Sequence, residues 1–293
     1  SDALGRKVVL ATSMLVLSVP TVLIALTHSL DAVIVLRFVQ GLSVPGIVVV
    51  LIAYIAEEFR QGGVARMTST YVSGTVMGGF SGRFITGHAG EWLGWRGAFL
   101  VLAALNLVGA LAVLWALPAS RNFVANRNLE ASLKTLRMHL RNRRLWAICA
   151  VGFCVLFSLV GCFTYVNLYL ADAPFHLTAA GLANVFGVYL FGALVTPIAA
   201  RLMVRHGFLR SMLLALAVSM AGLLMTLVPS LPVLIVGLAI CSSGVFICQS
   251  VTISHIADRV TEGRSLATGI YYMSYYAGGA AASWVAGMAY ERQ

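Results

Sequence analysis

The stretch AVIVLRFVQGLSVPGIVVVLIAYIA, at residues 32–56, decides the fold class. It carries a single charged side chain, Arg37, in a run longer than the roughly 20 apolar residues that cross ~30 Å of hydrocarbon as a helix. The stretch shows no strand-like alternation of apolar and polar positions, and in lipid a helix satisfies its own backbone hydrogen bonds. It therefore predicts a membrane-spanning helix.

Further stretches of the same kind occur along the 293 residues. The expected spans are approximately 8–27, 32–56, 68–86, 97–117, 145–170, 181–204, 211–228, 232–256 and 267–289. Hydrophobic residues make up 60% of the chain and charged residues 10%, whereas a soluble domain carries roughly 25% charged residues. Composition and spans together predict an all-α integral membrane protein with nine spans.

The 20 lysine and arginine residues are distributed unevenly between the loops. Most, including Arg6, Lys7 and the basic residues of segment 118–144, fall on one side of the expected spans, whereas Arg96 and Arg292 fall on the other. The positive-inside rule assigns the first side to the cytoplasm. We therefore expect a multi-pass membrane protein whose chain starts inside and ends outside. This placement explains the net charge of +10 without a nucleic-acid partner.

Segment 118–144 is the long polar stretch of the chain, and residues 128–139 within it have helical periodicity. It separates four expected spans from five. We therefore predict an N-terminal bundle at 1–117, a cytoplasmic linker at 118–144 and a C-terminal bundle at 145–293.

The two parts share an internal repeat. Tyr71, Gly78, Gly79 and Gly87 recur as Tyr271, Gly278, Gly279 and Gly287. Gly5 matches Gly207 at a similar shift, about 200 residues. Duplicated halves are typical of secondary transporters, whose substrate site lies between the halves. Since Gly207 follows a second span of its half, Gly5 predicts two spans before it, and the second half is expected to lack its last span.

Several motifs resemble those of the major facilitator superfamily. SDALGRK at 1–7 is similar to the family signature between helices two and three, and RFVQG at 37–41 is similar to its fourth-helix motif. SGTVMGGFSGR at 73–83 resembles the glycine-rich fifth-helix motif of exporters, without the proline of that motif. Residues 71–87 and 274–276 resemble bacterial proteins of the acriflavine-sensitivity, drug-efflux type. The resemblance covers essentially the whole chain and makes its spans helices three to eleven of twelve.

This resemblance implies two pseudo-symmetric helical bundles and secondary active transport by alternating access. It further implies proton-coupled export of small amphipathic or drug-like compounds across the bacterial inner membrane, by a monomer without a cofactor. The alternatives are a sugar or organic-anion transporter of the same fold, or a truncated membrane protein that does not transport.

The resemblance also assigns the transport path to the spans at 32–56, 145–170 and 232–256. The polar side chains expected along it, with two from the last span, are Arg37, Gln40, Tyr165, Asn167, Tyr169, Gln249, Thr252, Tyr272 and Tyr276. An arginine inside a span is costly unless it faces a cavity or a partner, and snorkelling to the outer interface is the alternative for Arg37. Plain packing is the alternative for the other side chains.

Two more groups of residues are expected to serve the conformational change. The resemblance makes Asp2, Gly5, Arg6 and Lys7 a cytoplasmic gate, which is asymmetric because Val204 and Phe208 stand at the positions of Asp2 and Arg6 in the second half. Small residues let helices approach and slide, and static packing is the alternative. The expected helix-packing glycines are Gly74, Gly78, Gly79, Gly82, Gly278 and Gly279.

Nothing in the spans has the pattern of an enzyme or a metal site, which needs paired acids, a Ser/His pair or clustered ligands. The five cysteines lie within spans without metal spacing. We therefore predict no catalytic residue, no metal and no cofactor. The ten carboxylates lie in loops or at span ends, so the sequence identifies no proton carrier in the path apart from His255, near a cytoplasmic end.

Overall fold

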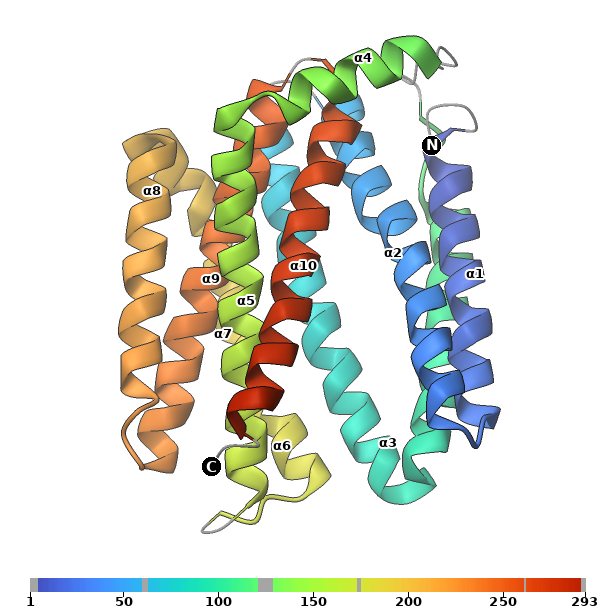
Figure 1. The fold of residues 1–293 in the computed structure, drawn as a ribbon, viewed down its shortest axis with the longest axis vertical. Helices are drawn as coiled ribbons and strands as arrows, with labels where there is room; N and C mark the ends of the chain where they lie inside the picture. The colour runs from blue at the N-terminus through green and yellow to red at the C-terminus, as the bar shows by residue number, and fades with distance from the viewer. Residues whose placement is uncertain (1–4, 60–62, 121–128, 173–174, 261, 291–293) are drawn as a thin grey trace. The chain divides into compact units, whose positions relative to one another are not determined.

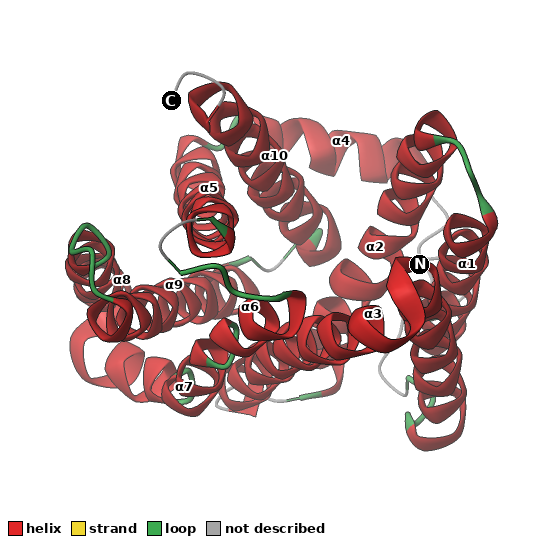
Figure 2. Cartoon of the chain, turned by 90° about the horizontal axis from the view of Figure 1, so that it is seen from below, coloured by secondary structure: helices red, strands yellow, loops and turns green. Residues whose placement is uncertain are grey.

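The computed structural model describes residues 5–59, 63–120, 129–172, 175–260 and 262–290. Over these ranges the regular structure is helical, and no strand occurs in them (Figure 2). The chain forms two compact units, residues 1–60 with 85–134 and residues 61–84 with 135–293, called unit 1 and unit 2 below.

Unit 1 is built on helices α1 (Arg6–Leu26) and α2 (Leu30–Glu58) and on the second part of α3 (Gly63–Ala116) (Figure 1). The α1 and α2 backbones approach closely, since a methyl group on Gly46 of α2 would overlap the side chain of Ser13. The second part of α3 joins them, and a methyl group on Gly109 would lie 3.2 Å from Met14 of α1. Small residues thus set the spacing of the three helices.

Helix α3 is long enough for the two expected spans that it contains. Its 54 residues would extend to roughly 80 Å at 1.5 Å per residue, whereas one span crosses ~30 Å of hydrocarbon. Helical conformation is interrupted inside it at Gly94, with φ 68° and ψ 173°. A positive φ is accessible to glycine at little cost. This glycine therefore marks the boundary between the spans at 68–86 and 97–117.

Unit 2 contains the first part of α3 and seven further helices. They are α4 (Leu129–Leu140, of which residues 135–140 belong here), α5 (Arg143–Ala171), α6 (Ala179–Val185), α7 (Val188–Val195), α8 (Ile198–Met225), α9 (Leu231–Arg259) and α10 (Arg264–Tyr290). Helix α9 packs against α8 and α7, and α10 packs against α5. The α8–α9 contact is a backbone contact, because a methyl group on Gly222 of α8 would overlap the backbone of Cys241 in α9.

The helices account for the expected spans and confirm an all-α membrane fold. Within the described ranges, six helices are long and apolar enough to cross a membrane by length and composition, and Arg66–Ala116 alone has 51 residues. The expected span at 181–204 is divided among α6, α7 and the start of α8. Pro197 lies at the second of these breaks, where it has no backbone N–H to donate to the preceding turn. The helical linker expected at 128–139 is α4.

Glycine geometry supports the internal repeat. Gly5, which precedes α1, has φ 86°, and its sequence counterpart Gly207, inside α8, has φ 74°. Both therefore have a positive φ shortly before an expected span.

The two compact units do not coincide with the expected bundles. Residues 61–84, placed by sequence in the N-terminal bundle, pack in unit 2: the Ser69 and Ser250 hydroxyls are 3.2 Å apart, and the Ser73 hydroxyl donates to Ala193 O at 3.1 Å. The bundle boundaries at 117 and 145 stay a prediction.

Candidate transport pathway

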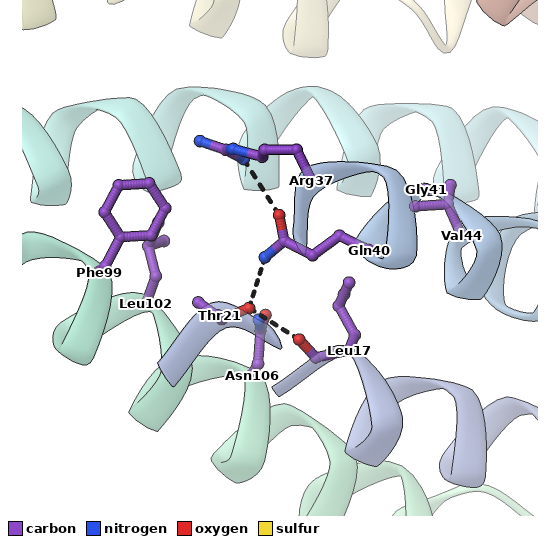
Figure 3. Close-up of a pocket in the computed structure, with 9 residues that line it drawn as sticks. All are labelled: Leu17, Thr21, Arg37, Gln40, Gly41, Val44, Phe99, Leu102 and Asn106. Atoms are coloured by element: carbon purple, nitrogen blue, oxygen red, sulfur yellow. Dashed lines mark hydrogen bonds between the residues drawn. The ribbon is translucent and has the colours of Figure 1, made fainter. Parts of the chain in front are cut away.

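A cavity of about 360 Å3 lies between α1, α2 and the second part of α3, within unit 1 (Figure 3). Its wall takes residues from all three helices: Leu17, Thr21, Arg37, Gln40, Gly41, Val44, Phe99, Leu102 and Asn106. The wall combines aliphatic and aromatic surface with one cation, two amides and a hydroxyl. A site of this kind can hold a molecule with an apolar body and a polar group.

The polar side chains of this cavity form a chain of hydrogen bonds (Figure 3). Arg37 Nη1 donates to Gln40 Oε1 at 3.3 Å, and Gln40 Nε2 donates to Thr21 Oγ1 at 2.7 Å. Thr21 Oγ1 donates in turn to Leu17 O at 2.7 Å. Three residues of helix bring Arg37 and Gln40 to the same face of α2, and the chain holds the amide in one orientation.

The Arg37 guanidinium lies in the cavity wall, with its central carbon 5.0 Å from the centre of the Phe99 ring. A cation over an aromatic face is stabilised by the ring quadrupole. Among the described residues no carboxylate pairs with Arg37. A cation in a span that has only an amide and a ring for partners retains donors for an anionic or polar guest.

The α5 side chains expected in the path do not gather at one point. Tyr165 Oη donates to Val285 O of α10 at 3.4 Å, and the Tyr169 ring packs edge-on against Phe175 with centroids 5.5 Å apart. Asn167 Oδ1 is buried and has no hydrogen-bond partner among the described residues. Tyr165 and Tyr169 therefore have packing contacts, whereas Asn167 retains an acceptor.

The α9 pair, Gln249 and Thr252, is buried, with exposed fractions of 7% and 1%. Thr252 Oγ1 donates to Cys248 O, one turn earlier in the same helix, at 2.7 Å. This bond satisfies the hydroxyl without a ligand, so the geometry of Thr252 fits the packing alternative.

Tyr272 and Tyr276 belong to a cluster of four tyrosines on α10. Their ring centroids are 5.9 Å apart, and the Tyr272 centroid is 5.3 Å from Tyr271 and 5.7 Å from Tyr275. The hydroxyls of Tyr271 and Tyr272 are buried without a hydrogen-bond partner among the described residues. The cluster is an aromatic surface, of which Tyr272 and Tyr276 are the members expected to line the path.

At the expected gate, the described residues form an ion pair. Arg6 Nη2 lies 2.6 Å from Glu57 Oε1, and Arg6 Nε donates to Glu57 Oε2 at 3.1 Å, so that both carboxylate oxygens are engaged. The Arg6 side chain is 6% exposed and that of Glu57 27% exposed. Asp2 lies outside the described residues. Glu57 was not among the expected gate residues, although the similarity of IAE at 55–57 to IAD at 256–258 was a usable signal.

In the second half an aromatic stack stands at the corresponding place. Phe208, the counterpart of Arg6, stacks on His255 with centroids 3.9 Å apart and rings inclined by 18°. The ends of the two repeats are therefore held by different chemistry, an ion pair in one and a ring stack in the other.

The expected packing glycines differ in their surroundings. A methyl group on Gly278 would overlap the Phe153 backbone of α5, and one on Gly279 would lie 2.8 Å from Leu156 Cδ2. A methyl group on Gly74, Gly78 or Gly82 would meet no atom within 4 Å. In this stretch α3 turns its serine face toward α7 and α9, and the close contact expected at those three glycines stays a prediction.

Gly79 lies beside Arg83, an arginine whose surroundings the sequence did not indicate. Arg83 Nη1 donates to Gly79 O at 2.9 Å, and its guanidinium carbon lies 4.7 Å from the Phe186 ring centre and 5.7 Å from that of Tyr189. Tyr189 contacts the Phe246 ring at 5.2 Å. Phe186 and Tyr189 come from the α6–α7 segment, so only the tertiary fold brings their rings to Arg83. Phe246 of α9 supports the Tyr189 ring from the other helix.

No group of three His, Cys, Asp or Glu side chains in the described ranges has the arrangement of a metal site.

Comparison with known proteins agrees on one family. The model of the family described as "Major Facilitator Superfamily" matches residues 1–283. The inner membrane transport protein YnfM of Escherichia coli is 34% identical over 292 residues, which cover 98% of this chain and 69% of that protein. The multidrug transporter MdfA of Edwardsiella piscicida is 28% identical over 204 residues, or 68% of this chain and 46% of that protein. Among solved structures, the human organic anion transporter MFSD10 matches with a TM-score of 0.70 at 20% identity, covering 97% of this chain and 72% of that one. That match shows a shared fold.

Proposed function

This chain belongs to the Major Facilitator Superfamily, and from that premise we propose that it exports small amphipathic or drug-like compounds in exchange for protons, by alternating access. Its family and its relatives are membrane transporters. The direction, the substrate class, the coupling ion and the monomeric state are the proposed part. We further propose the inner membrane as its location, as for the relative YnfM.

The amphipathic wall of the unit 1 cavity is the observation that carries the substrate class. Leu17, Leu102 and Phe99 offer apolar contact area, while Arg37 and Gln40 offer polar contacts at one end. A compound with a ring system and one polar group can bury the first part against the aliphatic and aromatic side chains and pair the second with the polar ones. The similarity to MdfA, a multidrug transporter, supports the same class.

Arg37 favours a second candidate, transport of organic anions. The guanidinium has no carboxylate partner among the described residues, and a carboxylate or sulfonate on the substrate would supply one. The shared fold with an organic anion transporter is compatible with this candidate. The two candidates differ in the charge of the best substrate.

The accumulation of two fluorescent compounds in cells that overproduce the protein tests both candidates. The pair is a neutral amphipathic dye such as Nile red and an anionic dye such as a carboxyfluorescein, each measured with wild type, Arg37→Ala, Arg37→Lys and an Arg201→Ala control. The first candidate predicts lower accumulation of the neutral dye with wild type than with Arg37→Ala, because Arg37 and Gln40 hold its polar group. The second predicts this difference for the anionic dye alone, with partial retention in Arg37→Lys because the charge remains.

Proton exchange is tested on the purified protein in vesicles that contain a pH-sensitive dye. We expect an imposed pH gradient to drive substrate movement and addition of substrate to release protons. If substrate movement does not respond to the pH gradient but still depends on Arg37, proton coupling is rejected and the proposal of transport stands. Equal accumulation of both dyes with and without the protein would reject the substrate classes proposed.

A further inference from the structure

A second cavity lies in unit 2, where the first turns of α5 meet the last turns of α9. Its volume is about 540 Å3. The polar part of its wall includes Arg144, His255 and Arg259, and the apolar part includes Leu145 and Ile148. The wall thus has a cationic end and an aliphatic end, and neither belongs to the cavity of the proposed transport pathway.

The positive charge of this cavity is largely uncompensated. No carboxylate of the described residues forms an ion pair with Arg144. Arg259 Nε lies 3.9 Å from Asp258 Oδ2, and both side chains are exposed, at 74% and 66%. A charge-assisted hydrogen bond has a length of about 2.7–2.9 Å, so this neighbour leaves the Arg259 donors available. His255 is held against Phe208 and lines the cavity with its ring.

Backbone donors contribute little to this charge. Asn142 caps α5, and its Oδ1 accepts from the backbone N–H of Arg144 at 3.0 Å and of Leu145 at 3.3 Å. The N–H groups of Arg144 and Leu145 are therefore satisfied within the chain, and the guanidinium groups of Arg144 and Arg259 are the cationic donors that the cavity offers. Two guanidinium groups with fixed fork geometry suit a phosphate better than a single point charge.

The cavity lies at the level expected for lipid headgroups. Trp146, directly after the cavity residue Leu145, donates its indole N–H to Leu140 O at 2.8 Å and is 49% exposed. Half-exposed tryptophans of membrane proteins mark the interface between hydrocarbon and headgroups. From this level α5 and α9 continue as apolar spans, so the aliphatic end of the cavity is continuous with the hydrocarbon region.

We propose that this cavity binds an anionic phospholipid, with Arg144 and Arg259 on its phosphate and the start of an acyl chain along Leu145 and Ile148. Basic pockets between transmembrane helices are known to suit such headgroups. This site does not depend on which compound is transported. A lipid would contact both the cationic and the aliphatic end of the cavity, whereas a soluble phosphate compound would contact only the cationic end.

The test is a native mass-spectrometry titration of the purified protein in detergent. The probes are dioleoyl phosphatidylglycerol, dioleoyl phosphatidylcholine and glycerophosphoglycerol, which is the first headgroup without chains. The double variant Arg144→Gln/Arg259→Gln is compared with Arg205→Gln/Arg210→Gln, which removes the same charge from exposed arginines of α8 outside the cavity. Size-exclusion profiles check that each variant is folded, and Arg144→Gln alone replaces the double variant if that variant aggregates.

We expect wild type to bind phosphatidylglycerol saturably and more tightly than phosphatidylcholine. Each arginine in contact with the bound headgroup contributes about a fivefold change in affinity, so the cavity variant should bind roughly 25-fold more weakly, and Arg144→Gln alone about fivefold. The control variant should stay near wild type. Equal binding of both lipids, or an equal loss in the control, would overturn the proposal. Displacement of the lipid by an equal concentration of glycerophosphoglycerol would replace it with a site for soluble phosphates.

Discussion

The contact between α5 and α10 gives the sharpest stability prediction, because backbone lies on both of its sides. A methyl group added at Gly278 would lie 2.8 Å from the carbonyl carbon of Phe153 and 2.9 Å from its Cα, and closer still to the carbonyl oxygen. Carbon atoms at contact stay about 3.5–4.0 Å apart, so Gly278→Ala forces the two helices apart by about 0.7 Å. No side-chain rotation relieves this overlap, since the atoms concerned belong to the Phe153 main chain.

The expected size follows from two opposing effects. Overpacking a well-filled contact costs about 1–3 kcal/mol, while alanine gains up to about 1 kcal/mol over glycine inside a helix. Gly278→Ala should therefore lose up to about 2 kcal/mol of stability. Gly279→Ala should lose less, because its obstacle is the end of the Leu156 side chain. Gly74→Ala is the matched control, since its methyl group would meet no atom within 4 Å and keeps the helix gain.

Heating of the three purified variants, followed by size-exclusion chromatography, measures the temperature at which half of each remains monodisperse. For a chain of this size 1 kcal/mol corresponds to roughly 2–4 °C, so Gly278→Ala should fall by several degrees while Gly74→Ala stays level or rises. A Gly278→Ala protein as stable as Gly74→Ala would refute the close contact between α5 and α10.

Three further outcomes follow from the described contacts. Removal of one partner of the half-buried Arg6–Glu57 pair leaves the other charge uncompensated, so Arg6→Gln and Glu57→Gln should each lower the heating midpoint. The double variant should recover part of this loss, and a loss equal to the sum of the two single losses would contradict the pairing. Arg83→Leu should lose roughly 0.5–2 kcal/mol of stability relative to Arg83→Lys, because its cation–π contacts disappear. Equal heating midpoints of the two variants would show that the cation–π contacts do not stabilise the protein. Gln40→Leu removes the hydrogen bonds to both Arg37 and Thr21, so cellular accumulation of the transported dye should rise toward the level of Arg37→Ala. Accumulation at the wild-type level would show that the Gln40 amide does not orient the Arg37 guanidinium.

Sequence reasoning succeeded where the signal is local. Span positions follow from runs of apolar residues, and helix α4 follows from the periodicity of 128–139. The spacing of Arg37 and Gln40 placed both on one helix face, and their hydrogen bond is consistent with that. These features depend on residues within a few turns of each other, so one chain suffices to predict them.

Tertiary contacts were beyond this reasoning because they depend on what lies opposite. Gly222, for example, lies against the backbone of Cys241 and Gly237, a close contact that no sequence pattern indicated. The breaks between α6, α7 and α8 were also missed, although Pro197 could have suggested the second.

The two repeats differ in chemistry at matching positions, the predicted gate in unit 1 and the neighbourhood of the second cavity in unit 2. In unit 1 the ion pair between Arg6 and Glu57 is largely shielded from solvent, so salt screens it weakly, and its separation requires desolvated charges to part. In unit 2 the counterpart of Arg6 is Phe208, whose ring covers His255 and leaves Asp258 without an arginine from that position. Arg259, at the end of α9, lines the second cavity, with its Nε 3.9 Å from Asp258 Oδ2. Since its side chain is exposed, an anion bound there should be released by salt concentrations that leave the Arg6–Glu57 pair intact. Where the first repeat has a shielded ion pair, the second therefore has a ring stack beside guanidinium groups that line a cavity.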